Sequence, residues 1–403
     1  MIRYLTAGES HGESLIGIVE GMPAKVPLPP NAINRPLARR WLGYGRGGRS
    51  KIENDRVHIY SGVRFGKTMG SPVSFRIDNG AYKKDRAGWP EVMAVDGPPP
   101  DDLERVTLPR PGHADLAGMQ KYEFDDIRPV IDRSSARETA MRVACCSVAR
   151  ALLNAFGIHV GSHVVRIGEV GYETEDEWLE RRNALLDEGG AKALYEAADD
   201  SETRMLSDAM TQRCIDHIEE AKTNRDSLGG IYEVVVTGVP AGLGSYVHWD
   251  RRLDGRLVQA ICSIQAQKAA EIGDGVRNAR RPGSKVHDPI LKGETTDDYP
   301  RRTNHAGGIE GGTTNGMPIV VRGYMKPIPT LIKPLDSVDT ATGEAQPTRY
   351  ERSDITSVPA ASTVAEATVA YTVANAFLEK FGGDSLPEIE RHLQAADGSS
   401  PSS

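Results

Sequence analysis

Six short segments of the chain have the pattern of β-strands. In each, branched apolar residues alternate with polar ones or form a short apolar run, which is typical of half-buried and fully buried strands. The segments are 16–19, 57–60, 73–77, 160–167, 231–237 and 318–321. The sequence therefore predicts at least these strands, separated by long intervening segments.

Four other segments have helical spacing. Two of them open with the Ser/Thr-x-x-Glu pattern of a capping box, in which two side chains satisfy free backbone N–H groups. The pairs are Ser135 with Glu138 and Thr363 with Glu366, and the predicted helices end at the glycines 157 and 382–383. A third helix is expected over 253–272, before Gly273, and a fourth over 205–221, where the apolar residues form one stripe.

The two capped helices have similar sequences. Residues 148–157 (VARALLNAFG) align with residues 373–382 (VANAFLEKFG), and six of the ten positions are identical. Alanine-rich helices can resemble each other by chance. Alternatively, the chain contains a duplicated unit whose two similar helices pack at its centre, and the pattern alone leaves both explanations open.

Three segments differ in character from the predicted core. Residues 78–108 are rich in loop signals, with three consecutive prolines at 98–100. Residues 172–200 are acidic and polar, and we expect a solvated helical excursion there. The tail after residue 396 is too polar to pack, which predicts disorder at 397–403.

The composition favours some classes of protein and argues against others. The 403 residues are 39% hydrophobic and 26% charged, enough for a large core, while 42 glycines and 6% aromatics favour sites built from backbone and small loops. The net charge of −7 argues against nucleic-acid binding. No apolar run approaches the ~18 residues of a membrane span, and the chain does not start like a signal peptide. Four cysteines lack metal-ligand or disulfide spacing. We therefore expect a cytoplasmic protein with no bound metal.

Three motifs match known patterns but lack their structural context. Residues 8–12 fit the Gly-x-Ser-x-Gly nucleophile elbow, yet only seven residues precede them and a strand follows. Residues 43–48 fit Gly-x-Gly-x-x-Gly, yet an Arg-rich helical segment stands where a dinucleotide-binding fold needs a strand. Residues 61–68 end like a P-loop but begin with serine. None of the three predicts its usual activity here.

Arginines and histidines gather in Gly-rich, weakly structured segments. Taken singly, each has an ordinary explanation as a solvated charge or a satisfied histidine. Together they indicate anion binding, because the planar guanidinium group pairs bidentately with phosphates and carboxylates. The residues are His11, Arg40, Arg46, Arg49, Arg110, His113, Arg133, Arg137 and Arg352. The pattern predicts a polyanionic small-molecule substrate, with His11 and His113 as candidates for proton transfer.

Many ordered segments of this chain resemble those of chorismate synthases. The resemblance extends over roughly residues 2–383 and is poor at 172–225. The matching segments are 8–12 (GESHG), 45–53 (GRGGRSKIE), 70–72 (GSP), 110–115 (RPGHAD), 128–139, 226–230 (DSLGG), 271–275 (EIGDG), 304–312, 326–330 (KPIPT), 352–354 (RSD) and 358–361 (VPAA).

The resemblance implies an activity and an architecture. The activity is 1,4-anti elimination of phosphate from 5-enolpyruvylshikimate 3-phosphate, which gives chorismate and needs reduced FMN without net redox change. The fold would be α+β, a single large domain over 1–396 with internal pseudo-symmetry, its central helices between antiparallel sheets. A homotetramer is implied as well. NADPH would serve only as a source of reductant, and a separate flavin reductase is expected because the chain has no large insertion.

The resemblance also implies roles for individual residues. Substrate carboxylates and phosphate, or a nicotinamide phosphate, would contact Ser10, Arg40, Arg46, Arg49, Arg110 and Arg137, with Arg352 bridging to the flavin. The catalytic residues would be His113 at the leaving phosphate, His11 at the reduced flavin and Asp354 near flavin N5. The flavin would be bound by Arg133, Ser134, Ser135, Gln265, Ala266, Gly311, Lys326, Pro327, Ile328, Pro329, Thr330 and Arg352.

Two other classes of function fit the same residues. A flavin-dependent oxidoreductase would bind the same cofactor but consume reductant stoichiometrically. A non-catalytic anion-binding protein would need neither histidine, so that replacing His11 and His113 by alanine would leave its function intact.

Overall fold

The amino-terminal strands pair into a four-stranded antiparallel sheet. In the computed structural model, which describes residues 1–47, 55–83, 88–172, 174–294, 299–348 and 354–396, its order is β1-β2-β6-β3. The strands are β1 (Arg3–Ala7), β2 (Ser14–Glu20), β6 (Val73–Asp78) and β3 (His58–Ser61). The predicted alternation is present: Leu15 and Val19 point into the core, whereas Ile16 and Ile18 lie on the outer face.

A second antiparallel sheet forms the other outer layer of the core. Its order is β10-β13-β9-β7-β8. The strands are β10 (Gln267–Ile272), β13 (Ile319–Met325), β9 (Gly230–Thr237), β7 (His159–Ile167) and β8 (Val170–Gly171). Strands β7 and β9 are buried along nearly their whole length because helices cover both faces, which agrees with their many branched apolar residues.

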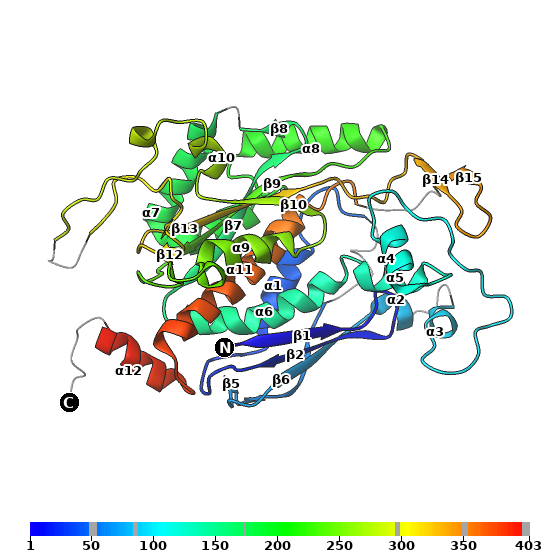
Figure 1. The fold of residues 1–403 in the computed structure, drawn as a ribbon, viewed down its shortest axis with the longest axis horizontal. Helices are drawn as coiled ribbons and strands as arrows, with labels where there is room; N and C mark the ends of the chain where they lie inside the picture. The colour runs from blue at the N-terminus through cyan, green and yellow to red at the C-terminus, as the bar shows by residue number, and fades with distance from the viewer. Residues whose placement is uncertain (48–54, 84–87, 173, 295–298, 349–353, 397–403) are drawn as a thin grey trace.

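The two helices with similar sequences lie between the sheets (Figure 1). Helix α6 (Glu138–Ala155) packs on β1 and β2, α11 (Val358–Phe381) packs on β7 and β9, and the two helices pack on each other. Phe156 and Phe377, both within the similar segments, are in ring contact at 4.9 Å. The α+β arrangement of central helices between antiparallel sheets is thus confirmed, while the duplication itself stays a prediction.

The remaining elements surround this core. The longer helices are α1 (Asn31–Arg40), α4 (Asp115–Tyr122), α5 (Arg128–Ser134), α7 (Glu175–Asp199), α8 (Asp208–Thr223), α9 (Leu253–Cys262) and α12 (Leu386–Ala396). Short helices are α2 (Gly80–Lys83), α3 (Trp89–Val92) and α10 (Gly275–Asn278), with 3-10 turns at Trp249–Arg251 and Gly283–Lys285. Small hairpins pair β4 (Val63–Arg64) with β5 (Lys67–Thr68), β11 (Ile309–Glu310) with β12 (Thr313–Thr314), and β14 (Asp336–Val338) with β15 (Ala345–Pro347). No helix of the described residues is long and apolar enough to span a membrane.

The helix predicted over 253–272 is wrong in its second half. Helix α9 ends at Cys262, and residues from Gln267 onward form the edge strand β10. Between them Ala266 has a φ of +65°, a left-handed conformation that side-chain-bearing residues rarely adopt. Pairing of β10 with β13 decides the outcome, because tertiary context overrides a local apolar pattern.

Both predicted capping boxes are wrong in their positions. Helix α6 starts at Glu138, so Ser135 lies outside it; its Oγ accepts the Arg137 N–H (3.3 Å), and the Glu138 N–H donates to the Ser135 carbonyl instead (3.1 Å). Helix α11 starts at Val358, with a proline in its first turn, which places Thr363 and Glu366 inside the buried helix. The glutamates pair with arginines instead of backbone N–H groups.

The excursion at 172–200 is helical but only partly solvated. Helix α7 packs on β7 and buries Trp178, Ala191 and Leu194. Its helical path is interrupted at Gly189 and Gly190. The fourth predicted helix corresponds to α8, which begins three residues later than the pattern indicated. The tail at 397–403 lies outside the described residues.

Candidate active site

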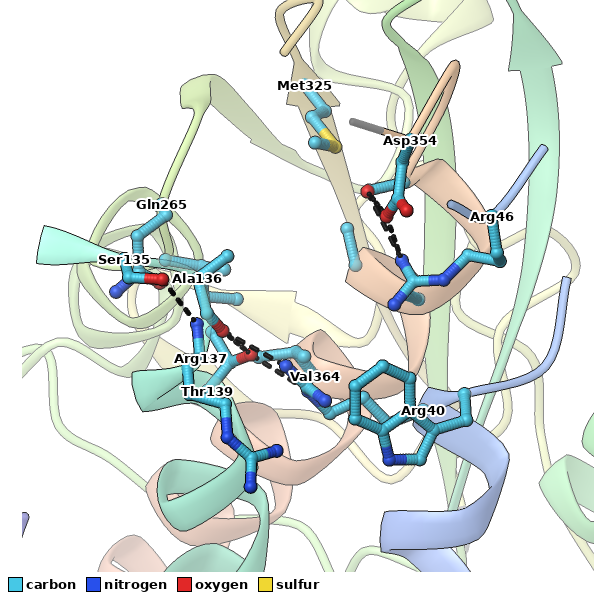
Figure 2. Close-up of a pocket in the computed structure, with 15 residues that line it drawn as sticks. Arg40, Arg46, Ser135, Ala136, Arg137, Thr139, Gln265, Met325, Asp354 and Val364 are labelled. Carbon is cyan, nitrogen blue, oxygen red and sulfur yellow. Dashed lines mark hydrogen bonds and ion pairs between the residues drawn. The ribbon is translucent and has the colours of Figure 1, made fainter. Parts of the chain in front are cut away.

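A cavity of about 180 Å³ lies where the end of α1, the α5–α6 junction, the start of α11 and the end of β13 meet (Figure 2). It is lined by Arg40, Trp41, Arg46, Ser135, Ala136, Arg137, Thr139, Ile264, Gln265, Met325, Asp354, Ser357, Ala360, Ala361 and Val364. Six of the residues singled out from the sequence therefore lie together, although they come from four distant parts of the chain. We call this the arginine cavity.

Arg46 and Asp354 form an ion pair in the arginine cavity (Figure 2). The Arg46 Nη1 lies 2.7 Å from Asp354 Oδ2 and donates to Ser357 Oγ at 3.2 Å. Asp354 also accepts the backbone N–H of Gly47 at 2.6 Å, which holds the loop that follows α1. The Nε of Arg46 is buried and, within the described part of the chain, has no hydrogen-bond partner. A buried donor of this kind is costly unless a ligand accepts from it.

Arg40 is buried at the end of α1. It donates to Thr139 Oγ1 at 2.9 Å, and Asp55 lies 3.4 Å from its Nη1. Burial lowers the pKa of Arg40 to about 10; Asp55 opposes this shift, while Arg137 and Arg46 add to it. Three guanidinium groups thus stand close together, and an anionic ligand would relieve their repulsion.

Asp55 is the buried carboxylate that holds this side of the cavity. It accepts from Arg137 Nη1 at 2.5 Å and from Trp41 Nε1 at 2.7 Å. Arg137 also donates through Nε to Asn79 Oδ1 at 3.0 Å. Neither Asp55 nor Asn79 is predicted from the sequence. The only available signal was the general rule that a buried arginine needs an acceptor nearby.

A second cluster contains His113. Its Nδ1 hydrogen-bonds Asp115, and Arg110 donates to the same carboxylate at 2.8 Å and to Thr330 Oγ1 at 3.2 Å. Burial alone would raise the pKa of Asp115, but the hydrogen bonds from His113 and Arg110 outweigh it and hold that pKa well below its ordinary value. The ionised Asp115 fixes Nδ1 of His113 as the protonated nitrogen and leaves Nε2 for another partner.

A third cluster contains His11. Asp132 of α5 accepts from Ser10 Oγ at 2.8 Å and lies 2.5 Å from His11 Nδ1. The imidazole stacks on Trp89 with ring centroids 4.0 Å apart. Asp132 therefore orients His11 as Asp115 orients His113, and it stands three residues before Ser135 of the arginine cavity. Both histidines are predicted from the sequence, but neither aspartate is predicted as their partner.

The residues expected at the flavin occupy different places. Gln265 and Ser135 line the arginine cavity, and Ala266 follows Gln265 and accepts the Lys326 N–H at 3.0 Å. The segment 326–330, with Pro327, Ile328 and Pro329, continues from β13 past the His113 cluster, where Lys326 donates to the Gly112 carbonyl at 2.5 Å.

Three further expected flavin contacts lie outside both the cavity lining and the segment 326–330. Arg133 donates to the Gly8 and Thr6 carbonyls, and Ser134 Oγ donates to a carbonyl of its own helix, α5. Gly311 lies in the β11–β12 turn beside Tyr246, at the opposite end of α9 from Gln265. Arg49 and Arg352 lie outside the described residues.

The fold places three largely buried guanidinium groups around one cavity, a lining whose chemistry suits an enzyme that acts on a polyanionic small molecule. Comparison with known proteins agrees and is specific. The family model for chorismate synthase matches residues 2–378. A chorismate synthase of Salinibacter ruber is 78% identical over 397 residues, which cover 98% of each chain. One of Chlorobaculum tepidum is 54% identical over 394 residues, covering 98% of this chain and 97% of the relative.

A solved structure agrees in fold. A crystal structure of a chorismate synthase is 40% identical in sequence and superposes with a TM-score of 0.78, covering 98% of this chain and 97% of the other. The chain belongs to the chorismate synthase family. Its activity is that of a carbon–oxygen lyase, which eliminates phosphate from 5-enolpyruvylshikimate 3-phosphate to give chorismate for aromatic amino-acid biosynthesis. This assignment sets aside the oxidoreductase and the non-catalytic anion-binding protein.

Proposed function

We propose that the arginine cavity and the two histidine clusters together bind the substrate and reduced FMN and carry out the elimination. The observation that carries this proposal is the buried Nε of Arg46, which has no partner among the described residues and lies beside Arg40 and Arg137. The substrate has two carboxylates and a phosphate, so about four negative charges leave water together. Charge-assisted hydrogen bonds contribute roughly 1.5–3 kcal/mol each, so several arginines are required.

The residues present also fit a flavin. Gln265 contributes a buried Oε1 without a partner in the described part of the chain, an acceptor suited to an N–H group of the isoalloxazine ring. The cavity volume of about 180 Å³ is smaller than the roughly 300–1,000 Å³ of typical ligand pockets. The binding site therefore includes the neighbouring surface of Ser135 and 326–330 as well as the cavity.

We assign one task to each group of residues in the elimination. When bound, the reduced flavin supplies electron density to a substrate whose leaving ring proton is not acidified by an adjacent carbonyl. Arg40, Arg46 and Arg110 bind and orient the anionic groups. His113, oriented by Asp115, holds a proton on Nε2 for the leaving phosphate. Asp354 accepts the proton from the substrate side, and Arg46 stabilises its carboxylate.

His11 has a separate role beside the flavin. Asp132 and the stacked Trp89 fix its ring, so that one imidazole nitrogen is available to set the protonation of the reduced flavin. The exposed Arg133, which braces the backbone at 6–8, keeps the segment that carries His11 next to α5.

We also propose a homotetramer in the cytoplasm. One exposed surface and one distance within the fold support assembly. Leu5, Ile16 and Ile18 form an exposed apolar stripe on the outer face of the first sheet, with 73%, 46% and 42% of each residue exposed. Gly311 is separated from Gln265 by the ten residues of α9, about 15 Å of helix, which suggests that its flavin contact belongs to a neighbouring subunit.

Reduced flavin should come from elsewhere. The described chain has no strand–glycine–helix unit at 43–47, where the loop instead follows α1, so nothing there supports a dinucleotide-binding fold. We therefore propose an enzyme without its own NADPH-dependent flavin reduction, supplied by a separate reductase.

The two histidines provide the test of the proposed roles. His113→Asn should bind both ligands and slow phosphate release, whereas His11→Asn should change the pH dependence of the reduced-flavin spectrum in the ternary complex. Asparagine keeps a hydrogen bond but does not titrate near neutrality as imidazole does. Single-turnover rates and flavin spectra between about pH 6 and 9 separate the two effects. Near-wild-type rates in both variants would refute the acid–base roles.

A further inference from the structure

A second cavity, of about 390 Å³, lies between α1, α6, the start of β7 and α7. It shares no lining residue with the arginine cavity. We call it the α1–α7 cavity. Its volume falls within the roughly 300–1,000 Å³ typical of small-ligand pockets.

The lining of the α1–α7 cavity is strongly basic. Five of its thirteen lining residues are basic, and no aspartate or glutamate of the described chain lines it. The basic residues are Arg35, Arg39, Arg150, His159 and Lys192. This composition is unusual in a protein whose net charge is −7. A concentration of one sign of charge in a concave site attracts ligands of the opposite sign.

Carboxylates behind the cavity do not cancel this charge. Glu366 accepts from Arg39 at 2.6 Å and from Arg150 at 2.9 Å, and it also pairs with Arg204. Asp199 pairs with Arg39 and Arg204. Three guanidinium groups thus meet two carboxylates, which leaves one positive charge in excess before the remaining cations are counted.

The other basic side chains, of which Lys192 and Arg35 are charged, are available to a ligand. The side chains of Lys192 and His159 have no hydrogen-bond or ion-pair partner among the described residues, and the one ion pair of Arg35 described there is with Glu196, at 4.0 Å. Burial lowers the pKa of His159, and the positive charges of Arg150 and Lys192 lower it further. That shift agrees with an excess of positive charge in the cavity.

One aromatic ring organises the arginines. The guanidinium carbons of Arg39, Arg150 and Arg35 lie 4.6, 5.5 and 5.7 Å from the centroid of the Tyr195 ring. Cation–π contacts of this kind hold side chains in fixed directions at little cost in solvation. The Tyr195 ring thus holds the buried Arg39 together with Arg150 and Arg35 along one wall of the cavity, whereas Lys192 is exposed and His159 partly buried at its rim.

We propose that the α1–α7 cavity is a second anion site, which binds a small phosphate-class dianion through Lys192, His159 and Arg35. The cavity is large enough for a phosphate monoester as well as for inorganic phosphate, which the elimination releases. Helix α1 joins this site to the active site, since it carries Arg35 and Arg39 into one cavity and Arg40 into the other.

Phosphate binding to charge variants tests the proposal. Isothermal titration with inorganic phosphate, at constant ionic strength set by chloride, compares the wild type with Lys192→Glu and His159→Gln. Lys285→Glu, a charge reversal at an exposed lysine outside this cavity, is the matched control. We expect phosphate affinity at this site to fall tenfold or more in Lys192→Glu and to fall in His159→Gln, with Lys285→Glu unchanged. Elimination with saturating substrate should persist in all three, which shows that they fold.

A second arm identifies the ligand and separates the two anion sites. The second titration uses glycerol 3-phosphate. If it binds more tightly than inorganic phosphate, and if this binding depends on Lys192, the ligand of the site is a phosphate monoester. If it binds equally or more weakly, the ligand is inorganic phosphate. Arg46→Ala should retain the Lys192-dependent binding, because that residue belongs to the other cavity. If phosphate and the monoester bind Lys192→Glu as tightly as they bind the wild type, the proposal is overturned. The assignment of the active site would not be affected.

Discussion

At the scale of single residues, Arg46 makes the most specific prediction. Its Nη1 contacts both Asp354 and Ser357, and its Nε faces the cavity without a partner in the described chain. Arg46→Lys keeps the charge but loses the fork geometry, so KM for the substrate should rise about tenfold or more, equivalent to roughly 1.4 kcal/mol. Anaerobic steady-state kinetics with reduced FMN measures this. Arg105→Lys, at an exposed arginine paired with Asp125, is the control. An unchanged KM in Arg46→Lys would remove this residue from substrate binding.

Asp115 predicts a pH dependence of stability. Its pKa in the folded protein lies below the ordinary aspartate value of about 3.9, because His113 and Arg110 outweigh the effect of burial. The ionised Asp115 therefore contributes fully to the free energy of unfolding when the pH is above the ordinary aspartate pKa. This contribution is lost as the pH falls from there toward the lower pKa of Asp115 in the folded protein. Asp115→Asn should cost about 3 kcal/mol at pH 7 and less at low pH.

Urea unfolding between about pH 7 and 3.5 measures the difference between Asp115→Asn and the wild type across the titration of an ordinary aspartate. Asp125→Asn is a suitable control, because that carboxylate is exposed and its pair with Arg105 should contribute little. A difference between Asp115→Asn and the wild type that stays constant with pH would contradict the pairing with His113 and Arg110.

Sequence reasoning identified cations better than their anionic partners. The cavity contains Arg40, Arg46 and Arg137, which the pattern of arginines in Gly-rich segments singled out. Asp55 was missed because its partners are 15 and 82 positions away and nothing local marks it. Asp132 was missed for the same reason. Which carboxylate neutralises a buried arginine is decided by tertiary packing.

At the scale of elements, Glu366 links the central helix to its neighbours. From the middle of α11 it accepts from Arg39 of α1, Arg150 of α6 and Ser162 of β7. Burial would raise the pKa of Glu366, but the surrounding arginines hold it well below its ordinary value. Glu366→Gln should therefore destabilise the protein by about 3–5 kcal/mol, because it leaves buried arginines without their countercharge.

The matched control for Glu366→Gln lies on the same helix. Glu379→Gln breaks a more exposed pair with Arg256 and should cost about 1 kcal/mol or less. Urea unfolding of both variants gives the two values. Equal effects would show that the buried network contributes no more than a surface ion pair.

Helices and strands could be predicted from the sequence wherever the buried residues recur at the regular spacing of that element. The six strands were found because β2, β6, β7 and β9 keep their apolar residues in register with the core. The helix predicted over 253–272 was wrong because β10 is an edge strand whose state depends on β13, fifty residues away in sequence. The capping boxes were wrong because Glu138 and Glu366 satisfy arginines and not backbone N–H groups.

At the scale of the whole molecule, the distribution of charge matters more than its sum. The chain is acidic overall, yet three arginines line each of two cavities linked by α1. Composition alone argued against nucleic-acid binding, but it did not indicate where an anionic ligand would bind. The position follows from the two sheets and the paired helices α6 and α11, which bring the loop after α1, the α5–α6 junction and the start of α11 to one point (Figure 1).

The most direct test of the central claim is anaerobic turnover of 5-enolpyruvylshikimate 3-phosphate with three flavin supplies: none, reduced FMN, and oxidised FMN with NADPH but no reductase. Chorismate and phosphate should form together only with reduced FMN, over many turnovers and without net oxidation of the flavin. Product formed without flavin, or flavin oxidised in step with product, would contradict the elimination proposed here. Product formed with NADPH and oxidised FMN would contradict its dependence on a separate reductase.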